Sequence, residues 1–185
     1  MAQYEDKSAK LYDRFLDGDM RALEQLVIEY GDSLTRFAYC IVKDDAAAED
    51  VTADTFATLV IKRKKFRGDS KFRTWLYAVA RNAAIDYLRK NGKNSPFTGL
   101  ENVLYSSCED DVMNSQRNQV LYAGMQKLPE SYRQVLCLSY FDGFSVKEMC
   151  HILKKSAKQV YNLLSRARSA LKDILVEEGY SYENF

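Results

Sequence analysis

The sequence holds little proline, glycine or histidine, and this scarcity restricts both the fold and the chemistry. Its 185 residues include two prolines, eight glycines and one histidine. The alternation of polar and apolar residues that marks β-strands is missing, whereas apolar residues recur at three- and four-residue steps. With His151 as the single histidine and no nucleophile motif, the common enzyme classes are disfavoured. The composition therefore predicts an all-α protein that is not an enzyme and has no catalytic residue.

Long apolar runs and paired cysteine motifs are missing as well. No segment approaches the length of a membrane span, about 18 apolar residues, and the N-terminus lacks the apolar core of a signal peptide. We therefore expect a cytoplasmic protein without membrane insertion. The four cysteines (Cys40, Cys108, Cys137 and Cys150) show no CxxC spacing and indicate free thiols. Cys150 beside His151 is a weak zinc cue, because adjacent helical side chains diverge. We expect no metal and no cofactor.

Charge is strongly segregated, although the net charge is only +1. Residues 44–60 carry five acids and no base, and residues 61–93 carry eleven Lys and Arg against two acids. Residues 94–115 then carry four acids and no base, and residues 154–172 carry six bases and no acid. Two basic blocks of this kind favour two polyanion-binding surfaces. Two solvated helix faces are the alternative.

Helical periodicity divides the chain into two parts. Three apolar stripes, from about Leu23 to Ile41, from Val51 to Val60 and from Phe72 to Leu88, can close a small helical bundle. Gly31 is a possible interruption of the first stripe. Residues 92–115, rich in Asn, Gly, Ser and acids, resemble a flexible linker. We therefore predict two small helical domains, at residues 10–91 and 116–178, joined by an acidic linker at 92–115.

The second predicted domain contains a helix-turn-helix pattern. Ser145 with Glu148, and Ser156 with Gln159, form two capping boxes eleven residues apart. They predict one helix from about Val146 to Leu153, a tight turn, and a second helix that begins at Ala157. Gly143 suits a left-handed stop before the pair.

The outer face of that second helix has the chemistry of a major-groove reader. Val160, Leu164, Ala167 and Leu171 share one face and predict the core side. Arg pairs with guanine, Asn pairs with adenine, and flanking cations hold phosphates. The opposite face carries no acid and supplies the candidate duplex-reading residues Lys158, Tyr161, Asn162, Ser165 and Arg166. An αα-hairpin with a basic exterior is the alternative.

The stretch "FRGDSKFRTWLYAVARN" at residues 66–82 combines aromatic rings with cations. Cations follow a phosphate backbone, while rings and polar pockets receive unstacked bases, so the combination suits single-stranded DNA. Spacing places Trp75 in the core and Thr74 and Tyr77 on the outer face of the helix, which we expect to begin near Asp69 or Ser70. The candidate residues are Phe66, Arg67, Lys71, Tyr77, Arg81 and Asn82.

The acidic helix before this stretch has two interpretations. Asp50 and Asp54 lie four residues apart, a repulsive pair that the positive end of the helix dipole partly offsets. The acids then either stabilise the helix start or form a docking face for a basic protein partner.

Three stretches resemble the extracytoplasmic-function (group IV) sigma factors of bacterial RNA polymerase, within the sigma-70 family. They are "AAAEDVTADTFATL", "FRGDSKFRTWLYAVARNAAIDYL" and "LPESYRQVLCLSYFDGFSVKEMCHIL" with the following "VYNLLSRARSAL". The sequence departs from the family at Ala53, where Gln is frequent, and at Tyr161 and Leu163, where Arg is frequent.

The resemblance implies a role for each candidate surface. Glu49, Asp50 and Asp54 would dock on the clamp helices of the polymerase β′ subunit. The loop from Phe66 to Lys71, with Tyr77, Arg81 and Asn82, would capture a flipped base of the promoter −10 element. The second domain would read the −35 element as duplex DNA and hold the β flap, and an anti-sigma factor is a usual partner. Binding, and not chemistry, would open the promoter.

Two other functions remain open at this stage. A helix-turn-helix regulator that binds duplex DNA without polymerase accounts for residues 129–175 but leaves the acidic helix and the aromatic basic loop without a role. A helical adaptor that binds only protein leaves both basic blocks unexplained.

Overall fold

A computed structural model describes residues 6–63, 65–91 and 120–180, and the predicted linker lies outside these ranges. Within them the structure has helices and no β-strand, so the all-α prediction is confirmed. The helices are α1 (Lys7–Leu16), α2 (Met20–Val42), α3 (Asp45–Lys62), α4 (Phe72–Asn91), α6 (Glu130–Leu136), the π-helix η1 (Cys137–Phe141), α7 (Val146–Leu153) and α8 (Ala157–Glu177). Residues 120–126 are also helical. None of the described helices is long and apolar enough to cross a membrane.

The first half, residues 6–91, is a bundle of four helices around α2. The buried face of α2 packs against α1, α3 and α4. The helix continues through Gly31 without the predicted interruption, and its C-cap is Lys43 in the left-handed conformation. Helix α1, which the apolar stripes did not predict, closes the bundle with Tyr12 and Phe15, both fully buried.

Aromatic rings fasten the loop after α3 to the bundle. The Phe66 ring centroid lies 5.7 Å from those of both Phe72 and Trp75, and the Tyr12 ring lies 5.2 Å from that of Phe72. Each aromatic pair contributes about 0.5–1.5 kcal/mol beyond the burial of its area. The start of α4 is also tied to the N-terminus, because the Asp6 carboxylate accepts a hydrogen bond from the Phe72 amide at 2.7 Å.

The second half, residues 120–180, contains the helix-turn-helix. Both bounds of α7 and the start of α8 agree with the sequence prediction, and both capping boxes are formed. Gly143 has a φ of 62° in the turn that precedes α7, as expected for a left-handed stop. Here η1 was not predicted; it follows α6 directly and leads to Asp142, whose amide donates to the Cys137 carbonyl.

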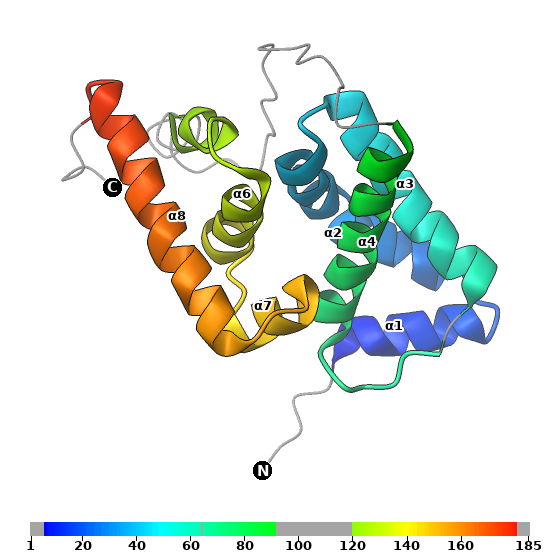
Figure 1. Cartoon of the computed structure of the whole chain (residues 1–185). Helices are drawn as coiled ribbons and strands as arrows, with labels where there is room; N and C mark the ends of the chain where they lie inside the picture. Colours follow the sequence, from blue (N-terminus) through cyan, green and yellow to red (C-terminus); the bar gives the residue numbers. More distant parts are fainter. Residues whose placement is uncertain (1–5, 64, 92–119, 181–185) are drawn as a thin grey trace.

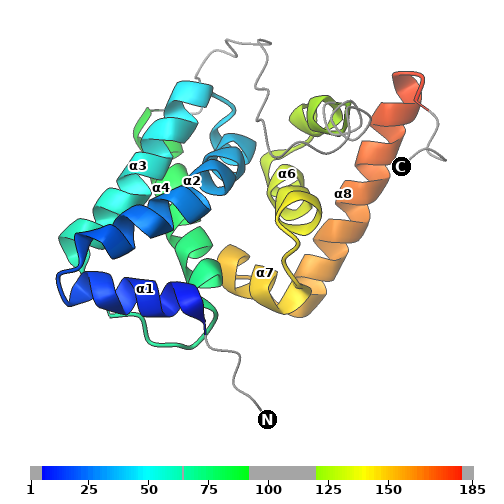
Figure 2. The ribbon, with the colours of Figure 1, turned by 180° about the vertical axis from the view of Figure 1, so that it is seen from behind.

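The two halves pack against each other. Figure 1 shows α1 to α4 on one side and α6 to α8 on the other, with α7 against the end of α4, and Figure 2 shows the same arrangement from behind. The helix pairs that meet across the boundary are α4 with α7, α2 with α6, and α2 with η1. Buried residues from both halves form one continuous hydrophobic cluster. We call this arrangement the closed arrangement.

Candidate polymerase and nucleic-acid interfaces

The outer face of α3 carries the predicted docking acids. Glu49, Asp50 and Asp54 are exposed, because the opposite face of the helix enters the core against α2 and α4. The Asp44 side chain caps the helix by accepting a hydrogen bond from the Ala47 amide at 2.7 Å. No ion pair found within the described ranges involves the three exposed acids. The face is therefore available to a basic partner in the closed arrangement.

The outer face of α8 is exposed in the same arrangement. Lys158, Tyr161, Asn162, Ser165 and Arg166 are all accessible, and the Tyr161 side chain is 61% exposed. The inward face is buried as the periodicity predicted, through Val160, Leu164, Ala167 and Leu171. Part of the outer face lines an open pocket of about 690 Å³ between α8 and the segment from η1 to α7.

Local hydrogen bonds fix how α7 and α8 begin. The Ser145 hydroxyl and amide both contact the Glu148 carboxylate, at 2.6 and 2.9 Å, and Ser156 and Gln159 repeat the motif in α8. Burial acts to raise the pKa of Glu148, but the hydrogen bonds from Ser145 and the Lys71 ammonium lower it below its usual value. The helix-turn-helix is thus specified by residues within four positions of each helix start.

The basic loop carries two exposed cations and one ring that is not free. Arg67 and Lys71 are exposed, and the Lys71 ammonium forms an ion pair with Glu148 of the second half at 3.1 Å. Phe66 is half-buried because its ring packs on Phe72 and Trp75. In this structure Phe66 anchors the loop to α4.

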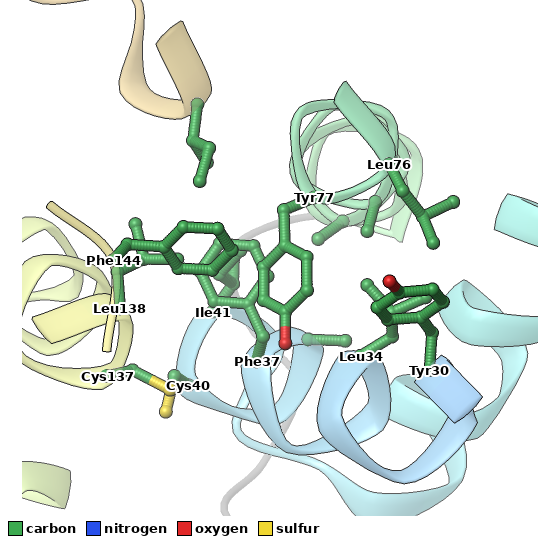
Figure 3. Close-up of a cluster of buried hydrophobic side chains, with 14 of the residues drawn as sticks. Tyr30, Leu34, Phe37, Cys40, Ile41, Leu76, Tyr77, Cys137, Leu138 and Phe144 are labelled. Carbon is green, nitrogen blue, oxygen red and sulfur yellow. The ribbon is translucent and has the colours of Figure 1, made fainter. Parts of the chain in front are cut away.

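The expectation that Tyr77 and Thr74 face outward is wrong for the closed arrangement. Both side chains are fully buried, because α7 and the turn before it cover that face of α4. The Tyr77 ring lies between Phe37 of α2, at 5.2 Å, and Phe144 of the second half, at 4.7 Å (Figure 3). Periodicity within one helix could not reveal this, since the covering residues lie more than sixty positions away.

A buried carboxylate lies where the halves meet. The Asp142 side chain is 0% exposed and its Oδ1 accepts a hydrogen bond from the Tyr77 hydroxyl at 2.8 Å. The guanidinium groups of Arg36 and Arg73 approach the same oxygen at 3.3 and 3.7 Å. Burial raises the pKa of Asp142, although the Tyr77 hydrogen bond and the two arginines act in the opposite direction. Burial and the Asp142 charge raise the pKa of Tyr77, so its hydroxyl remains a neutral donor.

The other predicted single-strand contacts on α4 also engage the second half. The Arg81 Nε donates to the Gln134 side chain at 3.0 Å, and the Lys154 ammonium donates to the Asn82 amide oxygen at 3.3 Å. Arg81 is half-buried and Asn82 is exposed. In the closed arrangement Tyr77, Arg81 and Asn82 therefore each contact the second half.

Arg133 is a structural residue that sequence reasoning missed. It is buried in α6, and its guanidinium donates to the carbonyls of Cys40 and Ile41 near the end of α2, at 2.8 and 3.4 Å, and to that of Leu128 at 2.6 Å. Burial lowers the pKa of Arg133. The residue satisfies carbonyls at the negative end of the α2 dipole and so fixes α6 on the first half.

Comparison with known proteins assigns both halves to one family. The sigma-70 region 2 model matches residues 26–94, and the sigma-70 region 4 model matches residues 118–171. The ECF RNA polymerase sigma factor SigM of Bacillus subtilis is 31% identical over 152 residues, which cover 81% of this chain and 93% of that protein. The chain belongs to the ECF sigma factors of RNA polymerase. The Escherichia coli ECF sigma-E factor is 27% identical over 173 residues, covering 87% of this sigma factor and 90% of that protein.

Solved structures have the same fold. CnrH in complex with the cytosolic domain of CnrY matches 93% of this sigma factor and 99% of that chain, with a TM-score of 0.67 and 25% identity. The sigma factor RpoE of Bartonella quintana, in complex with the anti-sigma factor NepR, matches 82% of this chain and 95% of that one, with a TM-score of 0.65 and 24% identity. Because the family models cover both halves, the regulator without polymerase is not favoured. Among the described residues no His, Cys, Asp or Glu cluster could hold a metal ion.

Proposed function

We propose that this sigma factor recruits core RNA polymerase through α3, reads the −35 element as duplex through α8, and holds an unstacked −10 strand through α4 and the loop before it. The proposal includes a first domain at residues 10–91, a linker at 92–115 and a second domain at 116–178. The protein acts by binding, in the cytoplasm with the polymerase, and catalyses no step. The observation that carries the proposal is the pair of exposed faces, one acidic on α3 and one free of acids on α8, within a single sigma-factor chain.

The polymerase contact is assigned to Glu49, Asp50 and Asp54. These exposed carboxylates lie on one face of α3, where they complement cations on the β′ clamp helices. The β flap is assigned to the second half. Solved relatives bound to CnrY and to NepR favour an anti-sigma partner for this chain as well.

A charge-reversal pair tests the polymerase contact. Asp50→Lys with Asp54→Lys should abolish co-precipitation with core polymerase, because two attractive contacts become repulsive. Asp13→Lys with Asp17→Lys is the matched control, since these exposed acids have the same spacing but lie at the end of α1. If the α3 variant binds core polymerase as the control does, the docking assignment is wrong.

The −10 assignment rests on Arg67, Lys71, Tyr77, Arg81 and Asn82, with Phe66 as the anchor of the loop. Because the second half buries Tyr77 and is hydrogen-bonded to Arg81 and Asn82, these three residues meet DNA only after the halves separate. Asn82→Ala should reduce run-off transcription to a degree that depends on the −10 sequence of the promoter. A uniform loss across a promoter library would instead indicate a phosphate contact or a folding role.

The −35 assignment rests on Lys158, Tyr161, Asn162, Ser165 and Arg166, all exposed on α8. Asn and Arg side chains discriminate bases in the major groove, while Lys158 suits a phosphate. Tyr161 supplies ring contacts where related factors often carry Arg. Footprinting of the holoenzyme on duplex promoters should show protection of the −35 region that Asn162→Ala weakens.

A further inference from the structure

Two cysteines meet across the boundary between the halves. Cys40 lies near the end of α2 in the first half, and Cys137 is the first residue of η1 in the second. Both are fully buried free thiols. The two side chains are close enough that Cys40 contributes to raising the pKa of Cys137. Figure 3 shows their sulfur atoms close together where α2 meets the second half.

The surrounding contacts hold both thiols at fixed positions. Arg133 donates to the carbonyl of Cys40 itself at 2.8 Å, which ties the end of α2 to α6. The Cys40 sulfur lies 3.7 Å from the Tyr122 hydroxyl, and the Cys137 sulfur lies 3.8 Å from the Asp142 carboxylate. A disulfide requires both sulfurs on adjacent, facing backbone segments. The closed arrangement meets that requirement, and separated halves do not.

We propose that Cys40 and Cys137 are a redox pair whose disulfide locks the sigma factor in the closed arrangement. The proposal rests on the function proposed above, because its consequence is loss of promoter opening. With the disulfide formed, Tyr77 stays buried, and Arg81 and Asn82 stay hydrogen-bonded to the second half. The acidic face of α3 stays exposed, so the locked chain keeps its polymerase-docking surface but cannot present its −10 surface.

The chemistry requires a peroxide and two thiols. While the halves are apart, hydrogen peroxide oxidises one thiol to a sulfenic acid and is itself reduced to water. Closure brings the second thiol to that sulfur, the S–S bond forms, and a second water leaves. The sum is two thiols and one peroxide giving one disulfide and two waters. A dithiol reductant reverses the lock by exchange and is oxidised in turn.

The closed, reduced protein is protected from this reaction. Burial, the neighbouring Cys40 and the Asp142 charge all raise the pKa of Cys137, so little thiolate is present. Oxidation therefore selects chains that are open when peroxide is present. Disulfide formation therefore inactivates open sigma-factor molecules first and leaves closed molecules reduced.

The test uses the full-length protein treated with hydrogen peroxide. A variant with Cys108→Ser and Cys150→Ser keeps only the proposed pair, and a second variant adds Cys40→Ser as its matched control. Peptide mapping under non-reducing conditions should recover a Cys40–Cys137 cross-linked peptide from the first variant. Run-off transcription with core polymerase should fall at least tenfold on oxidation and return with dithiothreitol. The Cys40→Ser control should keep its activity after oxidation.

Specific results would overturn the proposal. The claim that Cys40 and Cys137 form a disulfide would be wrong if the wild-type chain cross-linked through other cysteines. It would also be wrong if no cross-link formed after peroxide had oxidised Cys150. If the Cys40–Cys137 disulfide forms and transcription is unchanged, the disulfide does not hold the sigma factor in an inactive closed arrangement. If Cys40→Ser does not fold, Cys137→Ser serves as the control, and the wild-type peptide map stands without either. A reduced protein that directs no transcription would contradict the proposed function, whereas the peptide map would still decide on the thiol pair.

Discussion

Removal of one hydroxyl group should loosen the contact between the two halves. In Tyr77→Phe the ring keeps its packing between Phe37 and Phe144, while the Asp142 carboxylate loses its donor at 2.8 Å. Both side chains of the lost hydrogen bond are 0% exposed, so water does not replace the donor in the closed arrangement. Water does hydrate the carboxylate once the halves separate. The substitution therefore acts on the opening equilibrium.

The size of the effect follows from the charge of the acceptor. A hydrogen bond to a charged group contributes about 1.5–3 kcal/mol, and tenfold in an equilibrium constant corresponds to about 1.4 kcal/mol. We expect the constant for opening to rise about 10- to 150-fold. Residual pairing of Asp142 with Arg36 and Arg73 keeps the closed arrangement populated.

Thiol labelling measures this opening. Cys40 and Cys137 are buried at the boundary, so a thiol reagent modifies them only in open molecules. When closing is faster than modification, the labelling rate is proportional to the opening constant. The rate at each cysteine, followed by mass spectrometry, should rise by the same factor in Tyr77→Phe.

The matched control removes a hydroxyl group elsewhere in the second half. Tyr140 is 52% exposed, and its hydroxyl group has no hydrogen bond identified within the described ranges. Tyr140→Phe should therefore label at the wild-type rate. Equal rates in Tyr77→Phe and wild-type protein would refute the idea that the Tyr77–Asp142 bond holds the halves together.

Four further substitutions probe the helices and the DNA face. Gly31→Ala should raise the free energy of unfolding in urea by about 0.5–1 kcal/mol, because Gly31 lies inside α2 with open space around it. Gly143→Ala should instead lower the free energy of unfolding, because the φ of Gly143 is 62°. Glu148→Gln should lower the free energy of unfolding by about 0.2–1 kcal/mol near neutral pH. Because the pKa of Glu148 is lowered in the folded state, this difference from wild type should disappear as the pH falls from the usual glutamate range through that lowered value. Asn162→Ala should cost about 1–3 kcal/mol in binding to one −35 base pair in a mobility-shift series, with little change at other positions.

Local signals explain why the helix-turn-helix could be predicted residue by residue. The caps at Ser145 and Ser156 receive hydrogen bonds from amides only three positions later, so all the determinants lie within one turn. The inward and outward faces of α8 follow directly from its 3.6-residue period, and the structure buries and exposes them accordingly. Such elements are specified before the rest of the chain is considered.

Long-range contacts explain what the sequence did not reveal. The start of α4 is capped by Asp6 rather than by Asp69 or Ser70, through a hydrogen bond that joins residues 66 positions apart. Tyr77 is buried by residues of the second half, and η1 forms where the chain leads Asp142 to three partners in the first half. The helical period of α4 gives no information on which of its faces another domain covers.

The closed arrangement also constrains how polymerase can open the sigma factor. A ligand shifts a conformational equilibrium only by its difference in affinity for the two states. The acidic face of α3 is exposed with the halves together, and α3 packs on α2 and α4 of the first half. The docking proposed for this face would therefore recruit polymerase without favouring either state. Opening must be driven by contacts that only the separated chain offers, namely −10 DNA on α4 or polymerase on the covered side of α6 and α7.

This constraint predicts a difference between two ligands. A fragment of the β′ clamp helices alone should bind the sigma factor and leave the labelling rates of Cys40 and Cys137 unchanged. Core polymerase with promoter DNA should raise both rates, because it binds the uncovered face of α4 that carries Tyr77 and Asn82. If the clamp fragment alone accelerates labelling, α3 is coupled to the boundary between the halves, and recruitment and opening are a single step.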